Sequence, residues 1–225
     1  MIEGHFRRGV RYLWNKPTDS PAVLDGSLVD SAHAATQMVF DGLHFVHAAV
    51  DQQLLRGNVN NMLGFARIGA VVPYTWLDYT PGRTARVPIG GNDILTGYMS
   101  GCLIVRGTHN GVMSAFHVGT IDNNPIASNR VKEYFLLHLP NNATGFNPAA
   151  AWTPNEILAI RGNLRQNPAP NILALVTTAG AFHSILTFSL QVQNTTTNQA
   201  GQRYIYVGGI KQVPALNRDT LRRSL

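Results

Sequence analysis

The chain has 225 residues, of which 44% are hydrophobic and 13% charged, a composition that excludes an intrinsically disordered chain and suits one domain with a single core. Lysine and arginine outnumber aspartate and glutamate by 18 to 12, giving a net charge of +6, and the single cysteine excludes an intrachain disulfide or a cysteine-based zinc cluster. No apolar run approaches the ~20 residues of a transmembrane helix, so we expect no membrane span.

The N-terminal part of the chain has a helical pattern. From Ser27 to about Leu55, apolar residues recur near helical spacing, so residues 1–66 are expected to form a partly helical extension of one domain that spans residues 1–225. His44 and His47 lie three residues apart in this stretch, but no Asp, Glu or Cys completes a recognisable metal site. We expect this pair to be structural and the protein to use no metal.

Strand-like segments dominate the rest of the chain. The content of β-branched and aromatic residues predicts strands at 71–77, 85–89, 134–139, 172–178, 184–192 and 203–213. The capping box Thr153-Pro154-Asn155-Glu156 predicts a helix from Pro154 to about Leu164. The whole pattern indicates an α+β fold that is mainly β.

A β-hairpin is predicted directly after the only cysteine. The apolar runs Leu103-Ile104-Val105 and 112–118 flank a polar Gly-Thr-His-Asn-Gly loop. If the loop is symmetric, Cys102 lies directly opposite His117, and if Asn110-Gly111 forms a two-residue turn, His117 is its diagonal neighbour. Both registers place the two side chains on one face of the hairpin, because a shift of the pairing sum by two preserves strand parity.

A thiol beside an imidazole can act as a nucleophile with its own acid/base group. The imidazolium lowers the thiol pKa, the thiolate attacks a carbonyl carbon, and the same imidazole protonates the leaving amine. Thr96 can orient the imidazole, Gly101 allows close approach of a substrate, and N–H groups around Cys102 can stabilise an oxyanion. The alternative is that Cys102, which precedes an apolar strand, is only a buried small hydrophobic side chain.

This segment resembles a family of toxins. Thr96, Tyr98-Met99-Ser100-Gly101-Cys102 and His117 are similar to the nucleophile segment of the cytotoxic necrotizing factor catalytic domains and of the Burkholderia lethal factor type of toxin. Those families share Leu-Ser-Gly-Cys followed by a His on the neighbouring strand, and Met99 replaces the Leu here. The related chemoreceptor glutamine deamidases also place a Thr six residues before the Cys. The similarity covers residues 94–118, and a Gly-Gly-Ile turn at 208–210 is compatible with the same fold.

The resemblance implies a β-sandwich core surrounded by helices and a hydrolase that converts a glutamine of a host protein to glutamate. Cys102 is then the nucleophile, His117 the acid/base and Thr96 the third catalytic residue, without any cofactor. It also implies a secreted bacterial effector that acts in the host cytoplasm as a virulence factor. The leading target is a small GTPase of the Rho family, and the alternative is a translation factor, the initiation helicase. We expect a monomer, exported without a recognisable signal peptide or as part of a larger chain.

Other polar side chains are candidates for the surroundings of the site. The residues expected to line the substrate cleft are Tyr98, Ser100, Gly101 and His109. Asp93 is expected either to line the cleft or to pack beside it, and His138 and His183 are expected to be structural histidines on or beside strands.

Three other functions remain open. In a transglutaminase, an amine instead of water would resolve the same thioester. A cysteine protease fits less well, because the papain-type pattern places its Cys at a helix start and its His far downstream. A basic binding module would leave Cys102 buried and dock nucleic acid or an acidic protein. Of these two partners nucleic acid is not favoured, because aromatic residues are not interleaved with the basic ones.

Overall fold

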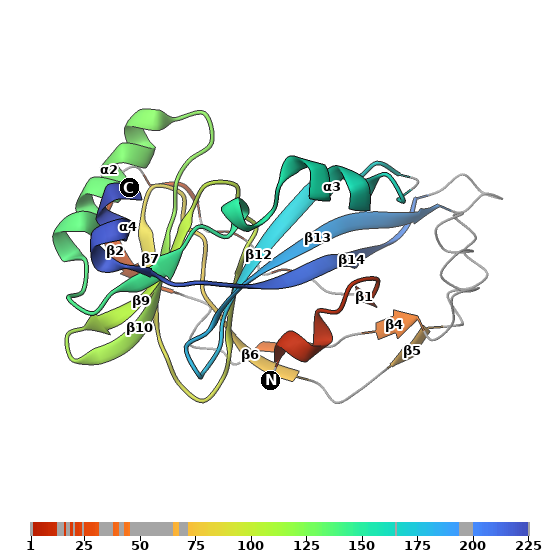
Figure 1. The fold of residues 1–225 in the computed structure, drawn as a ribbon, viewed down its shortest axis with the longest axis horizontal. Helices are drawn as coiled ribbons and strands as arrows, with labels where there is room; N and C mark the ends of the chain where they lie inside the picture. The colour runs from red at the N-terminus through yellow and green to blue at the C-terminus, as the bar shows by residue number, and fades with distance from the viewer. Residues whose placement is uncertain are drawn as a thin grey trace.

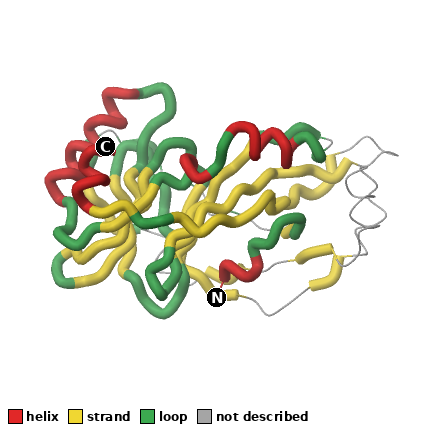
Figure 2. Tube along the Cα trace, in the orientation of Figure 1, coloured by secondary structure: helices red, strands yellow, loops and turns green. Residues whose placement is uncertain are grey.

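The computed structural model describes residues 2–12, 16, 19, 21–23, 25–31, 38–40, 43–45, 65–67, 72–164, 166–193 and 200–224. Strands predominate over helices in these ranges, so the predicted α+β, mainly β class is confirmed (Figure 2). The helices are η1 (Ile2–His5), α2 (Pro125–His138), η4 (Ala149–Ala151), α3 (Pro154–Arg161) and α4 (Arg218–Ser224). Of these helices, none is long and apolar enough to cross a membrane.

The larger sheet runs through the centre of the molecule (Figure 1). In spatial order its strands are β1 (Arg11–Tyr12), β14 (Ala200–Val213), β13 (Phe182–Gln193), β12 (Pro170–Val176), β8 (Ile94–Gly97), β6 (Val72–Trp76) and β3 (Met38–Phe40). All neighbours are antiparallel except β6 and β8, which are parallel.

The smaller sheet contains the predicted hairpin. In spatial order its strands are β15 (Leu216–Asn217), β11 (Thr144–Phe146), β9 (Leu103–His109), β10 (Val112–Val118), β7 (Thr84–Pro88) and β2 (Leu28–Asp30). A separate pair is formed by β4 (Leu43–Phe45) and β5 (Phe65–Arg67).

The two main sheets pack face to face and enclose the largest core. Ile104 and Ala115 of the smaller sheet contact the same buried cluster as Ile172 and Ala174 of the larger one. The outer face of the smaller sheet is covered by α2 and α4, which lie together at one end of the molecule (Figure 1). This is the β-sandwich with helices outside that the resemblance implies.

Two of the elements predicted from the sequence are wrong. The stretch 27–55 was expected to be helical, but its described parts are the strands β2, β3 and β4; the rest lies outside the described residues. Residues 134–139 were expected to form a strand, but 134–138 are the last residues of α2 and Leu139 caps its end. Asn124 caps the start of α2 by accepting a hydrogen bond from the Ala127 N–H. The buried Val131 and Phe135 are four residues apart, a helical spacing that the aromatic content of the segment obscured.

Three of the described N-terminal strands belong to the main sheets, whereas β4 pairs with β5. β1 pairs with β14, β2 pairs in parallel with β7, and β3 pairs with β6. These three strands lie at edges of the two sheets. That residues 1–66 form an extension of the single domain stays a prediction.

The expected turn at 208–210 is also wrong, because Gly208 is a β-bulge inside β14. Leu186 of β13 pairs with Gly209, whereas Thr187 pairs with Val207, so Gly208 is the extra residue. Lys211 consequently shares a face with Ser184 and lies over the ring of Trp152, 4.4 Å from its centroid. Because of the bulge, Val207 and Gly209 lie on opposite faces of the sheet although they are two residues apart, and the alternation of faces continues from Gly209.

The helix predicted from the capping box is confirmed. The Thr153 side chain accepts a hydrogen bond from the Glu156 N–H, and the Glu156 carboxylate accepts one from the Thr153 N–H. α3 begins at Pro154 and ends at Arg161, three residues before the predicted end at Leu164.

Candidate active site

The hairpin register brings Cys102 and His117 to one face. Val112 pairs with His109 and His117 pairs with Ile104, so the turn is the two-residue Asn110-Gly111. Cys102 is therefore the diagonal neighbour of His117 on the inner face of the smaller sheet. The parity argument made from the sequence is confirmed.

His117 is held from the opposite sheet. Thr96 lies on β8 and His117 on β10, and the Thr96 Oγ1 is 2.7 Å from the His117 Nδ1. Both side chains are fully buried. The ring of Tyr79 stacks on the imidazole with centroids 5.1 Å apart and planes at 28°. The imidazole is thus fixed at one nitrogen and at one face.

The other imidazole nitrogen and the thiol do not meet. The Cys102 Sγ is 3.4 Å from the Thr120 Oγ1, whereas the His117 Nε2 is buried and has no hydrogen-bond partner among the described residues. The expected direct hydrogen bond between thiol and imidazole is absent from this part of the structure. The hydroxyl that the sulfur contacts instead belongs to Thr120, which follows β10.

Burial keeps both reactive groups uncharged. It raises the pKa of the Cys102 thiol, which the charge of Asp122 raises further, while the Thr120 hydroxyl and the N–H groups of Thr120 and Gly101 lower it. Burial also lowers the pKa of His117 to about 3, and the charge of Lys16 lowers it further. At neutral pH the resting pair is therefore a thiol and a neutral imidazole, which can accept a proton.

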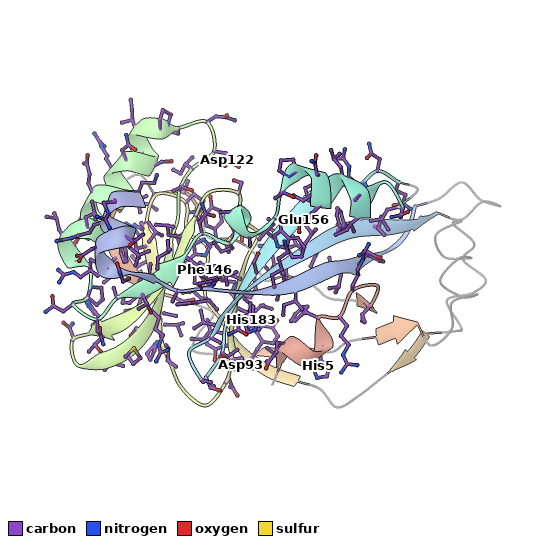
Figure 3. All side chains as sticks on the ribbon, in the orientation of Figure 1. His5, Asp93, Asp122, Phe146, Glu156 and His183 are labelled. Carbon is purple, nitrogen blue, oxygen red and sulfur yellow. The ribbon has the colours of Figure 1, made fainter. Side chains whose placement is uncertain are left out.

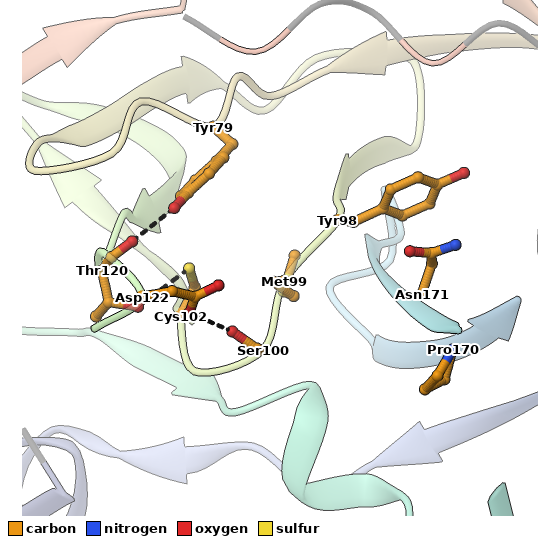
Figure 4. Close-up of a pocket in the computed structure, with 9 residues that line it drawn as sticks. All are labelled: Tyr79, Tyr98, Met99, Ser100, Cys102, Thr120, Asp122, Pro170 and Asn171. Atoms are coloured by element: carbon orange, nitrogen blue, oxygen red, sulfur yellow. Dashed lines mark hydrogen bonds between the residues drawn. The ribbon is translucent and has the colours of Figure 1, made fainter. Parts of the chain in front are cut away.

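Cys102 lines a surface cleft of about 210 Å³ (Figure 4). The described residues around it are Tyr79, Tyr98, Met99, Ser100, Cys102, Thr120, Asp122, Pro170 and Asn171. Figure 4 shows Thr120, Asp122 and Ser100 grouped near the sulfur, with Tyr98 and Asn171 on the far side of Met99. Cys102 is only 3% exposed, so a reagent reaches the sulfur through this cleft.

Two of the expected cleft residues line it. The Ser100 hydroxyl donates a 2.8 Å hydrogen bond to Asp122 Oδ1. Tyr98 forms the far wall, and burial raises its pKa to about 12, so it remains a neutral phenol. Gly101 is exposed beside the cleft, and a Cβ added to it would meet only the Thr120 Oγ1, at 3.8 Å.

His109 does not reach the cleft. It ends β9 at the turn of the hairpin, seven residues after Cys102, which corresponds to roughly 23 Å of extended strand. Its ring packs edge-on against Phe116, 6.2 Å between centroids.

Asp93 is structural. Its carboxylate accepts hydrogen bonds from the Ile2 N–H (3.0 Å) and the Thr178 N–H (2.8 Å), tying the start of the chain to the larger sheet. Figure 3 shows it well apart from Asp122, which lies on the opposite side of the molecule in this view.

The remaining histidines lie elsewhere. His138 is in α2 rather than on a strand and stacks on Tyr134, and His183 is on β13 as expected. His44 lies on β4 and His47 lies outside the described residues. In the described ranges no three His, Cys, Asp or Glu side chains are placed to share a metal.

Sequence reasoning missed Tyr79, Thr120 and Asp122, although one signal was available. With the Asn110-Gly111 turn, paired positions sum to 221, so the residues after β10 return to the end of the hairpin where Cys102 lies. Thr120 and Asp122 were thus predictable neighbours of the thiol. Asn171 was not, because it reaches the cleft through the long-range pairing of β12 with β8.

The arrangement offers a sulfur nucleophile at a cleft, a buried proton acceptor behind it, and backbone N–H groups beside the sulfur. These are the parts needed for acyl transfer through a thioester. No known family model matches the chain, and no curated protein matches it.

Proposed function

We propose that the protein is a cysteine-dependent amidohydrolase that deamidates a glutamine of another protein. The observation that carries the proposal is the buried hydrogen bond between Thr96 and His117, directly behind the cleft that Cys102 lines. The imidazole is oriented by Thr96, and its Nε2 has no partner among the described residues. It also lies on the same face of the hairpin as the only thiol, an arrangement that a purely structural role of this histidine does not explain.

The reaction begins with proton transfer. In this mechanism the neutral His117 carries its proton on Nδ1 and donates it to the Thr96 Oγ1, 2.7 Å away, which leaves the Nε2 lone pair free to accept the thiol proton. Diagonal neighbours on a hairpin are within reach of an aromatic side chain, so a change of the Cys102 side-chain torsion brings its thiol to the imidazole, and the deprotonated sulfur then accepts a hydrogen bond from the Thr120 hydroxyl. The thiolate forms only at that moment, because burial disfavours a standing ion pair.

The chemistry then takes two steps. The Cys102 sulfur bonds to the carboxamide carbon, the imidazolium gives its proton to the nitrogen, and the carbon–nitrogen bond breaks to release ammonia. Water next attacks the thioester while His117 takes its proton, and the carbon–sulfur bond breaks to give glutamate and the free thiol.

The cleft favours a side chain over a free metabolite. Its volume of about 210 Å³ is below the range of roughly 300 Å³ and above that is typical of small-molecule sites. Among its described lining residues Asp122 is the only carboxylate and none is basic, so nothing there would hold the α-carboxylate of free glutamine. A glutamine within a protein has neither terminal charge.

The biological setting follows from the sequence resemblance. We propose a secreted bacterial effector whose target in the host cytoplasm is a Rho-family GTPase, with a translation-initiation helicase as the second candidate. The local likeness at residues 94–118 supports this setting.

Intact-mass analysis tests the proposal. The protein is incubated with each candidate target, and we expect a gain of about one dalton, release of ammonia, and one modified glutamine by peptide mapping. Cys102→Ser should reduce the rate at least ~1,000-fold with an unchanged circular dichroism spectrum, because a serine hydroxyl has no comparable anion near neutral pH.

Two results would count against deamidation. Equal rates for wild type and Cys102→Ser would remove the nucleophile from the mechanism. Mass gain only with an added primary amine, without ammonia release in its absence, would identify a transglutaminase instead.

A further inference from the structure

Tyr79 contacts both halves of the candidate site, although nothing in the sequence pattern marks it. Its ring stacks on His117 with centroids 5.1 Å apart, and its hydroxyl donates a 2.6 Å hydrogen bond to the Thr120 carbonyl. Thr120 in turn places its Oγ1 3.4 Å from the Cys102 Sγ. One side chain thus connects the imidazole to the residue that contacts the thiol, and Figure 4 shows the part of this connection from Tyr79 through Thr120 to Cys102.

The backbone around Tyr79 and Thr120 is closely fitted. The Gly119 N–H donates to the Arg83 carbonyl (2.9 Å), and the Gly82 N–H donates to the Gly119 carbonyl (2.7 Å). A Cβ on Gly119 would lie 2.2 Å from the Thr80 carbonyl oxygen, so this approach requires glycine. These bonds hold the two loops side by side up to Gly119. The next carbonyl, that of Thr120, is bonded by the Tyr79 hydroxyl instead.

We propose that Tyr79 is a positioning residue and Thr120 a further catalytic residue of this site. The Thr120 hydroxyl contacts the reacting sulfur and stabilises its anion, while Tyr79 fixes Thr120 through its hydroxyl and supports the imidazole through its ring. The catalytic part of this inference rests on the proposed function; the coupling of Tyr79 to the thiol does not.

Burial agrees with these roles. The Tyr79 phenol remains a donor because burial raises its pKa, with the charges of Cys102 and Asp122 adding to the effect. The Thr120 hydroxyl and N–H both favour the charged form of Cys102. Thr120 therefore contacts the Cys102 sulfur directly, and Tyr79 affects that sulfur through its hydrogen bond to Thr120.

The single cysteine gives a direct readout, because its S–H stretching band is the only one in the Raman spectrum of the protein. Thr120→Val should move this band to the position of a thiol without a hydrogen bond. Tyr79→Phe keeps the ring and should move the band part of the way in the same direction. The double variant should match Thr120→Val alone, because coupled residues are not additive. Tyr134→Phe, on α2 away from the cleft, is the matched control and should leave the band unchanged.

Activity gives the second readout. Tyr79→Phe should lower kcat by about 3–10-fold with little change in KM, as expected for the loss of one hydrogen bond that acts on the chemical step. A wild-type band in Tyr79→Phe, or a double variant whose shift is the sum of the two single shifts, would overturn the inference.

The two proposals fail in different ways. If the band shifts as expected but no glutamine is deamidated by the wild type, the proposed function fails while the coupling of Tyr79 to the thiol stands. If deamidation is observed but Tyr79→Phe has wild-type kcat and band, Tyr79 has no positioning role.

Discussion

His117 is completely buried, and only one of its two ring nitrogens has a hydrogen-bond partner among the described residues. Nδ1 is bonded to Thr96, whereas Nε2 has no partner in the described part of the chain. Protonation would place a charge in the core between the two sheets, which explains why the pKa falls to about 3. The imidazole is therefore neutral in the folded protein near neutral pH.

The first prediction concerns the pH dependence of stability. Between about pH 6.5 and 3 the unfolded chain binds a proton at His117 and the folded chain does not, so stability is present above pH 6.5 and is lost as pH falls. At pH 5 we expect the wild type to have lost about 2 kcal/mol of unfolding free energy through this residue.

Urea unfolding at pH 7.5, 6 and 5 measures this loss. His117→Gln removes the titrating group and should lose correspondingly less between the same pH values. Identical pH profiles for the two proteins would show that His117 is protonated in the folded state.

The residues of the site could be predicted to different degrees. The parity of the hairpin was sufficient to place Cys102 and His117 on one face, and the expected contact of Thr96 with the imidazole is present. The preference of the sulfur for Thr120 was not predictable, because it depends on a rotamer and on a loop whose path is fixed by contacts with residues 80–83. The direction of a side chain at the end of a strand depends on contacts with residues that are distant in the sequence.

Among the structural elements, β8 depends on a glycine where it ends. Gly97 has φ 149°, and a Cβ there would lie 2.7 Å from the Leu173 Cδ2 and 2.8 Å from the Ile172 carbonyl oxygen. The close approach lets β12 pair with β8 next to Thr96. The position of Thr96 therefore depends on this glycine.

The second prediction compares two glycines of the same segment. Gly97→Ala should destabilise the protein by about 1–3 kcal/mol in urea unfolding, because both the backbone angle and the neighbouring strand oppose a side chain. Gly101→Ala should change stability by less than about 0.5 kcal/mol, since its Cβ would make only an ordinary van der Waals contact, 3.8 Å from the Thr120 Oγ1.

The activity of Gly101→Ala then separates two roles of this residue. A loss of deamidation without loss of stability would mean that the substrate needs the room beside Cys102. Wild-type activity would mean that Gly101 has no part in substrate approach.

Local signals predicted some elements and not others. The hairpin and the capped helix α3 have turn and cap residues that act within a few positions, and both were found. The strands within 27–55 and the helix at 134–138 were missed. The apolar residues of a short segment fit both the helical and the strand periodicity, so the partner segment that packs against it determines which structure forms. For α2 that partner is the outer face of β9 and β10.

Across the whole molecule, the bond between Thr96 and His117 joins the two sheets of the sandwich. Around this bond the sheets meet through apolar side chains such as Ile104, Ala115 and Ala174. A polar link in such a layer fixes how one sheet lies on the other, because an unpaired buried group is costly. The contact joins β8 of the larger sheet to β10 of the smaller one. The strand order of the two sheets was not predictable from local sequence patterns.

The third prediction tests this link. Thr96→Val keeps the shape of the side chain but leaves both nitrogens of His117 without a partner, so unfolding free energy should fall by about 1–3 kcal/mol. Deamidation should fall less than in His117→Ala, because Thr96 orients the acid/base and does not replace it.

Thr84→Val is the matched control for this substitution. The Thr84 Oγ1 is also buried but has no hydrogen-bond partner in the described structure, so the same change should be neutral or stabilising. A similar loss of stability in both variants would mean that the hydroxyl of Thr96 contributes nothing beyond its volume.

The bulge at Gly208 gives β14 one place where its length can change. Removing Gly208 would leave Val207 opposite Thr187 and Gly209 opposite Leu186, so residues 209–213 would keep the faces they have now. Lys211 would stay over Trp152 and keep its ion pair with Glu156. Homologous chains that lack one residue in this part of β14 should therefore have a regular strand here and keep the contact between Lys211 and α3.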